Sequence, residues 1–243
     1  YKKRHFFYLG IQMYYKSGYD TDYIEYLLNR QHKIRYIFNA DNTKSSIELN
    51  LEESIEEIYS RIRKGHKSDI KKAEKTGLTV GLAKDNSELS SFIDVYSRMC
   101  RVRGISDDGL TAENINEVHK FLEEFKRGQI LIVKDGSGSV IGGAIIIFQG
   151  ISVRYFKGTT DPDRRDLPIL HILIYEAVKL AKEANFKYFD FWGYNHFTEK
   201  DDQVSNINHF KKGFGGYYTF FAKKMNIDLV PNGFTLFRSM TVL

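Results

Sequence analysis

The sequence contains little cysteine and little proline, and it has no long apolar run. Its single cysteine, Cys100, excludes an internal disulfide and a metal site built from several cysteines, and it suits a reducing cytoplasm. No apolar run approaches the roughly 18–20 residues that a membrane-spanning helix needs. We also expect no signal peptide. These absences favour an intracellular protein without a disulfide framework.

Well-known catalytic motifs are missing as well. The sequence has no HExxH, CxxC, GxSxG or P-loop pattern, so metal-dependent, serine-hydrolase and nucleotide-triphosphatase chemistry have no support. Internal repeats, low-complexity tracts and linkers rich in serine or proline are also lacking. We therefore predict a reaction that needs no metal ion.

What the chain does contain is typical of a folded protein with an anionic partner. A length of 243 residues suffices for one large or two small domains. A hydrophobic content of 42%, with 14% aromatic residues, indicates a globular chain. The net charge of +5 and the pI near 9.0 favour phosphates, nucleotides, RNA or an anionic membrane surface, and do not choose among them.

Periodicity predicts an alternation of helices and strands. Apolar residues at three- and four-residue spacing indicate helices, and alternating or β-branched runs indicate strands. The predicted helices span 20–29, 52–75 with a break at Gly65, 87–103, 112–127, 167–185 and 206–212. The predicted strands span 33–38, 45–51, 78–83, 129–134, 140–148, 151–159, 186–192 and 217–222.

The predicted helix over 52–75 carries the densest group of cations in the chain. Ile55, Ile58 and Ile62 recur on one face, and the opposite face is basic. That basic face comprises Arg61, Arg63, Lys64, Lys67, Lys71, Lys72 and Lys75. It could neutralise a pyrophosphate, or it could be the solvated side of an amphipathic helix.

The stretch 186–221 combines a strand, a polar loop, a short basic helix and a second strand. Asp190 interrupts the first strand, and a carboxylate there must lie at the strand end or be paired, because burying a bare charge is costly. Lys211 and Lys212 follow on the short helix, which Gly213 closes. The two lysines beside Asp190 could hold an anion, or they could be an ordinary solvated face.

Two segments resemble one known family. The stretch KYFDFWG…NINHFKKGFGG is similar to the C-terminal signature of the FemAB-like branch of the Gcn5-related N-acyltransferase superfamily. Residues 61–78, RIRKGHKSDIKKAEKTGL, resemble an upstream helix and turn of the same branch. The resemblance implies an α/β (α+β) fold with a mixed, mostly antiparallel sheet flanked by helices. The order of elements expected from periodicity agrees with it.

The resemblance also implies a domain division. Residues 1–45 would be the remainder of a degenerate first acyltransferase-like domain, and residues 46–243 the acyltransferase domain. The chain begins at Tyr1 rather than Met, so we expect it to be a fragment of a longer protein.

The expected activity is transfer of an aminoacyl group from aminoacyl-tRNA to an amine of a UDP- or lipid-linked peptidoglycan precursor. This reaction needs no cofactor. The alternative donor is acetyl-CoA, with an amino-sugar or polysaccharide precursor as acceptor. Loop 158–170 disfavours coenzyme A, because it has no glycine after Gly158, Pro168 removes an amide donor, and Asp161, Asp163 and Asp166 would repel phosphate. A second alternative is a non-catalytic module that binds RNA or an anionic lipid.

Individual residues have expected roles, and the resemblance supplies that of Lys211. Lys211, after Phe210, would place a cation near the reacting ester and stabilise the developing oxyanion. Asp190 would orient the acceptor amine or fix a nearby cation. The expected substrate-binding residues are Arg63, Lys67, Lys71, Arg154, Tyr155, Lys157, Trp192 and Phe210. We expect a cytoplasmic protein, with a peripheral contact at the inner face of the membrane as an option.

Overall fold

The computed structural model describes residues 8–12, 36–39, 45–104, 112–194, 203–220 and 224–228. Contacts divide the chain into two units. One comprises residues 1–46, 193–197 and 218–243, and the other residues 47–192 and 198–217. The helix expected over 20–29 lies outside the described residues.

The smaller unit contains a three-stranded antiparallel sheet. β1 (Tyr8–Gln12) and β2 (Tyr36–Asn39) both pair with β10 (Lys224–Asp228), which lies between them. A strand from near the C-terminus thus joins two strands from the first 45 residues. The division of the chain into domains at residue 45 stays a prediction.

A seven-stranded sheet forms the centre of the larger unit, in the order β4-β5-β6-β7-β8-β3-β9. Neighbours from β4 to β7 pair antiparallel, β8 pairs antiparallel with β3, and β7 and β8 run parallel. This confirms the predicted mixed, mostly antiparallel sheet. The strands are β3 (Ser45–Asn50), β4 (Thr79–Leu82), β5 (Gly128–Lys134), β6 (Val140–Gln149), β7 (Ser152–Thr160), β8 (Tyr188–Asp190) and β9 (Tyr217–Phe220).

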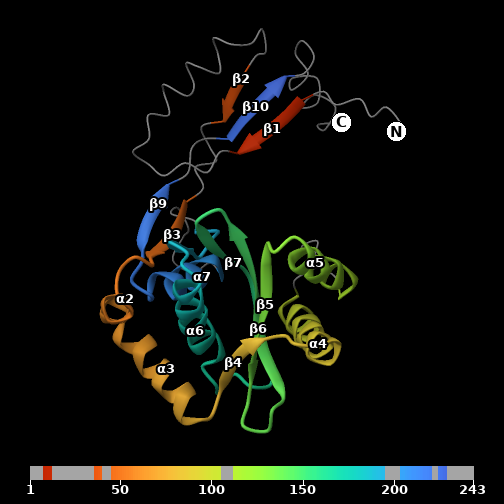
Figure 1. Cartoon of the computed structure of the whole chain (residues 1–243), viewed down its shortest axis with the longest axis vertical. Helices are drawn as coiled ribbons and strands as arrows, with labels where there is room; N and C mark the ends of the chain where they lie inside the picture. The colour runs from red at the N-terminus through yellow and green to blue at the C-terminus, as the bar shows by residue number, and fades with distance from the viewer. Residues whose placement is uncertain are drawn as a thin grey trace. The chain divides into compact units, whose positions relative to one another are not determined.

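Helices cover both sides of this sheet. Figure 1 shows α4 and α5 on one side and α6 on the other, with α3 packed on α6. None of the helices in the described ranges is long and apolar enough to cross a membrane. The helices are α2 (Ile55–Arg61), α3 (Lys64–Lys75), α4 (Asn86–Arg103), α5 (Ala112–Glu124), α6 (Ile169–Glu183) and α7 (Gln203–Lys212).

Local sequence explains where several helices begin. Ser54 and Glu57 form a capping box at the start of α2, each side chain accepting from the other residue's backbone N–H. Asp85 accepts from the N–H groups of Ser87 and Glu88 at the start of α4. These caps satisfy backbone donors that a helix leaves without an intrahelical partner.

The break between α2 and α3 is not at Gly65, as predicted, but at Ile62 and Arg63. Both residues have extended ψ angles, 134° and 143°. Ile62 is buried, and the Arg63 N–H donates to the carbonyl of Gly213, 2.8 Å away. A contact with a segment far along the chain therefore sets the break, and Gly65 lies inside α3.

The strand predicted to reach Trp192 ends at Asp190 instead. Asp190 Oδ1 accepts from the Trp192 N–H at 2.8 Å, which turns the chain, and Trp192 has a positive φ of 50°. β7 and β8 consequently pair over only three residues, Ser152–Arg154 against Tyr188–Asp190, while β7 continues to Thr160. The two parallel strands therefore separate, or part, after the pair of Arg154 with Asp190.

Candidate functional site

The two signature segments lie against each other. The start of α3 contacts the end of α7 and the turn after it. Besides the bond from the Arg63 N–H to Gly213, Arg61 Nε donates to the carbonyl of Gly215 at 3.3 Å. A long-range contact therefore joins the two stretches that carry the family resemblance.

The glycines of the FKKGFGG stretch make this close approach possible. A Cβ on Gly213 would lie 2.3 Å from His66 Nε2. Gly215 has φ +75°, and a Cβ there would lie 2.5 Å from the carbonyl oxygen of Arg61. The motif therefore needs glycine for packing as well as for backbone conformation.

Lys211 lies at the end of α7 and is only 8% exposed. Its Nζ donates to the carbonyl of Trp192. Burial lowers the pKa of Lys211 to about 8, because it disfavours the ammonium, and the negative charge of Asp190 opposes that shift. Lys211 thus places a partly desolvated cation where β7 and β8 part.

Asp190 is 2% exposed and is held from two directions. Arg154 Nε lies 3.1 Å from Oδ2, and the Trp192 N–H binds Oδ1. The Arg154 guanidinium carbon also lies 3.7 Å from the centre of the Trp192 ring. The structure thus brings together four of the predicted site residues, Lys211, Asp190, Arg154 and Trp192.

Glu48 joins this group, and sequence reasoning missed it. In the register of the sheet Glu48 lies opposite Asp190 on one side, and Arg154 lies opposite Asp190 on the other. Residues paired in this way share a face of the sheet. Nothing in the sequence pointed to Glu48, and in the structure it is only 7% exposed.

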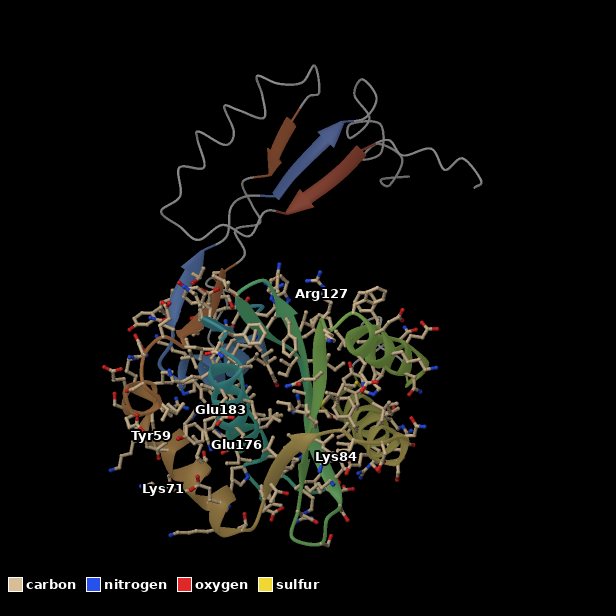
Figure 2. All side chains as sticks on the ribbon, viewed as in Figure 1. Tyr59, Lys71, Lys84, Arg127, Glu176 and Glu183 are labelled. Carbon is tan, nitrogen blue, oxygen red and sulfur yellow. The ribbon has the colours of Figure 1, made fainter. Side chains whose placement is uncertain are left out.

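Three predicted cations lie elsewhere on the surface of α3 and at its start. The guanidinium of Arg63 contacts the rings of His209 and His66. Lys67 Nζ donates to the carbonyl of Ser60 at 2.7 Å, and Lys71 is exposed (Figure 2). Arg63 therefore links α3 to α7, and substrate binding by these three residues stays a prediction.

The regular alternation of side chains along β7 is interrupted between Tyr155 and Lys157. The pairing of β6 with β7 shifts between Ile145 and Ile146, so Lys157 and Tyr155 face successive residues of β6. Tyr155 folds back over Gly158, where an added Cβ would lie 1.7 Å from its hydroxyl oxygen, and burial raises the pKa of Tyr155. A role for Tyr155 and Lys157 toward substrate stays a prediction.

Phe210 lines a cavity of about 460 Å³ at the start of α6. Cations and carboxylates both contribute to its wall. The wall comprises Asp69, Lys72, Thr160, Arg164, Arg165, Asp166, Leu167, Pro168, Ile169, Leu170, His171 and Phe210.

The loop before α6 is less repulsive to phosphate than its sequence suggests. Arg98 pairs with Asp161 at 2.8 Å and with Asp163 at 3.1 Å. The first turn of α6 nevertheless offers few amides, because the N–H groups of Ile169 and His171 donate to the carbonyls of Leu167 and Pro168. The identity of the donor stays a prediction.

A second group that sequence reasoning missed is His66, Asp69 and His171. The two imidazole rings meet edge to face with centroids 4.5 Å apart, and His171 Nε2 lies 3.4 Å from Asp69 Oδ2. Burial lowers the pKa of both histidines, that of His171 to about 4. One signal in the sequence could have indicated that His66 is buried. It lies four residues after Ile62 and four before Ile70, which are both buried.

Sequence comparisons agree with this architecture. Residues 60–211, more than half of the chain, match the family model described as an acetyltransferase (GNAT) domain. Lipid II:glycine glycyltransferase of Staphylococcus haemolyticus is 30% identical over 101 residues, which are 42% of this chain and 24% of that protein. The enzyme of the same name from Staphylococcus aureus strain USA300 is 26% identical over 142 residues, 56% of this chain and 34% of that protein. The aligned regions thus span between a quarter and about a third of these relatives.

Solved structures share the fold. The crystal structure of FemX superposes with a TM-score of 0.80 at 15% identity, over 96% of this chain and 74% of that chain. L-PGS from Bacillus licheniformis superposes with a TM-score of 0.57 at 11% identity, over 94% of this chain and 70% of that chain. The chain belongs to the acetyltransferase (GNAT) domain family, in its FemAB-like branch.

Proposed function

We propose that this chain is the catalytic part of an acyltransferase that moves an aminoacyl group from aminoacyl-tRNA to an amine of a lipid-linked cell-wall precursor. The observation that carries the proposal is the buried ammonium of Lys211, held beside Asp190 where β7 and β8 part. Curated relatives that are lipid II:glycine glycyltransferases support the choice of acceptor.

The reaction requires little from the protein beyond position and charge. The acceptor amine attacks the ester carbonyl carbon, and a negative charge develops on the carbonyl oxygen. The intermediate then breaks the ester C–O bond, the amide forms, and the proton lost by the amine balances the one gained by the leaving ribose oxygen. Lys211 would stabilise the oxyanion, and Asp190 would orient the amine.

A direct assay tests this assignment. Purified protein is given labelled aminoacyl-tRNA with a lipid-linked muramyl pentapeptide, and in parallel acetyl-CoA with a UDP-linked amino sugar. We expect aminoacyl transfer, reduced about 100- to 1,000-fold in Lys211→Met. The matched control is Lys212→Met, since Lys212 is the exposed neighbour of Lys211.

Other results would each overturn part of the proposal. Acetyl transfer without aminoacyl transfer would replace the donor. The cavity at the start of α6, lined by Lys72, Arg164 and Arg165, gives that alternative a place for phosphate. Binding of tRNA or lipid that is equal in wild type and Lys211→Met, without any turnover, would favour a non-catalytic binding module.

The pH profile distinguishes two roles for Lys211. If the ammonium stabilises the oxyanion, the rate of transfer falls as pH rises through about 8, where Lys211 loses its proton. A rate that rises through the same pH in wild type but not in Lys211→Met would mean that the neutral amine of Lys211 is needed as a base. Peripheral contact with a membrane stays a separate prediction, which flotation with anionic vesicles would check.

A further inference from the structure

His66 has a defined tautomer, set by its two neighbours. Nε2 lies 2.9 Å from the carbonyl oxygen of Phe210, and Nδ1 lies 3.2 Å from a guanidinium nitrogen of Arg63. A carbonyl oxygen can only accept and a guanidinium can only donate, so Nε2 carries the hydrogen and Nδ1 accepts. Burial lowers the pKa of His66, which keeps this neutral form.

The bonds from α3 lie on both sides of Lys211. The His66 Nε2–H donates to the carbonyl of Phe210, the residue before Lys211. The Arg63 N–H donates to the carbonyl of Gly213, two residues after it. The His66 ring also packs against Phe214, with centroids 4.9 Å apart, and leaves no room for a side chain at Gly213.

We propose that His66 is a positioning residue for Lys211. By donating to the Phe210 carbonyl, it holds the last turn of α7 so that the Lys211 side chain stays buried against the Trp192 carbonyl and beside Asp190. The proposal rests on the catalytic role proposed above for Lys211, but its first test needs no substrate.

His66, Asp69 and His171 also have the residue types of a metal site, and their ligand atoms lie within 4.8 Å of one another. The arrangement around His66 argues against a cation there. Its Nε2 is bonded to Phe210, and the only lone pair, on Nδ1, accepts from the positively charged Arg63. An ion would have to displace Arg63, so we assign the cluster to packing and positioning.

The first test measures the pKa of Lys211 by competitive acetylation across a pH series, with mass spectrometry to separate Lys211 from Lys212. Three variants are compared with wild type. His66→Phe keeps a ring but has no donor, and His66→Gln keeps an N–H near the position of Nε2. His119→Phe makes the same replacement on α5, where His119 pairs with Glu123 at 3.4 Å.

We expect the Lys211 pKa to rise by about one unit or more in His66→Phe, because the freed side chain moves toward water. His66→Gln and His119→Phe should keep the wild-type value. The charged and titratable groups around the pair do not change among these variants. They are Asp190, Arg154 and Glu48 around Lys211, and Arg63, Asp69, His171 and His209 around His66. An unchanged Lys211 pKa in folded His66→Phe would overturn the proposal.

A second variant covers the case in which His66→Phe does not fold. Arg63→Met removes the donor that fixes the His66 tautomer but leaves the ring in place. We expect a smaller shift of the Lys211 pKa in the same direction, and no shift would overturn the proposal. Stabilisation of wild type by Zn²⁺ that is lost in His171→Phe would also overturn it, in favour of a metal site.

Kinetics separate this proposal from the proposed function. In the transfer assay we expect His66→Phe to lower kcat about 10- to 100-fold with KM unchanged, and His66→Gln to restore most of it. If Lys211→Met retains activity, the proposed function fails whatever His66 does. If kcat falls in His66→Phe while the Lys211 pKa stays at its wild-type value, positioning of Lys211 is not the cause.

Discussion

The packing of α4 and α5 on the sheet differs in kind from the junction of α3, α6 and α7. Beneath α4 and α5 lies a cluster of buried hydrophobic residues, with Phe92 and Ile145 fully enclosed. At the junction, His66 is buried against the rings of His171 and Phe210. Lys211 is buried with its Nζ on the Trp192 carbonyl and the charge of Asp190 nearby. Apolar burial stabilises the fold, whereas a buried ammonium lowers stability. The difference indicates which region is kept for stability and which for chemistry.

The largest expected effect on stability lies under α4. Phe92 is fully buried and lies near Gly143, where a Cβ would meet its ring at 2.8 Å. Replacing it with alanine leaves a cavity in a closely packed core. We expect Phe92→Ala to lower the free energy of unfolding by about 3–5 kcal/mol, measured by urea denaturation. A loss below about 1 kcal/mol would mean that this core is not the main source of stability.

At the junction of α3, α6 and α7, Lys211→Met should raise the free energy of unfolding, whereas Phe92→Ala lowers it. Relief of the lowered pKa is worth about 3 kcal/mol, and the Trp192 carbonyl left without its donor costs about 1 kcal/mol. Asp190 retains Arg154 and the Trp192 N–H. We therefore expect the free energy of unfolding at pH 7 to rise by about 2 kcal/mol while transfer is lost.

The pH dependence of the free energy of unfolding of wild type checks whether the lowered pKa of Lys211 is the reason. The unfolded chain keeps the Lys211 proton up to its ordinary pKa of 10.5, and the folded chain releases it near 8. The unfolded state thus binds more protons between these values, so stability should rise with pH across them. Lys211→Met should lack this part of the rise. Identical slopes in the two proteins would contradict a buried ammonium.

Gly213→Ala should be destabilising by about 1–3 kcal/mol, because the new methyl group would meet the His66 ring. The change also displaces the turn after Lys211, so kcat should fall together with the melting temperature. Thermal unfolding and initial rates measure the two effects. Full activity in Gly213→Ala would show that α7 tolerates a shift away from α3.

Gly65→Ala, on α3, is the control for Gly213→Ala, and it should have the smallest effect. A Cβ at Gly65 would meet nothing within 4 Å, and the residue lies inside α3. Alanine has the higher helix propensity, so we expect a gain of about 1 kcal/mol in the free energy of unfolding and unchanged kcat. A lower free energy of unfolding would mean that the break between α2 and α3 needs glycine at position 65.

Local sequence was sufficient for most of the fold. The apolar spacing of α4 and α6 predicted helices where the structure has them. The predicted strands of the large sheet are also confirmed, apart from their ends. The errors occurred where a distant residue decides the local conformation. Ile62 and Arg63 break the helix because Arg63 bonds to Gly213, and β8 ends early because Asp190 binds the Trp192 N–H.

The residues of the candidate site also fall into some that were predicted from the sequence and one that was missed. The resemblance pointed to Lys211, Asp190, Arg154 and Trp192, and the structure places these four together. Glu48 was missed because nothing in its local sequence shows that it lies opposite Asp190 or that it is buried.

By itself the sequence determined the kinds of element, their order and the two signature segments, because periodicity, caps and glycine positions act over a few residues. Tertiary structure alone decided that those segments pack together, that His66 bonds to Phe210, and that Lys211 is buried with its pKa lowered to about 8. The physical reason is that burial and hydrogen-bond partners depend on residues far apart in the chain. The lowered pKa of Lys211 therefore arises only when α7 packs against Asp190 and Trp192, which lie far from it in the sequence.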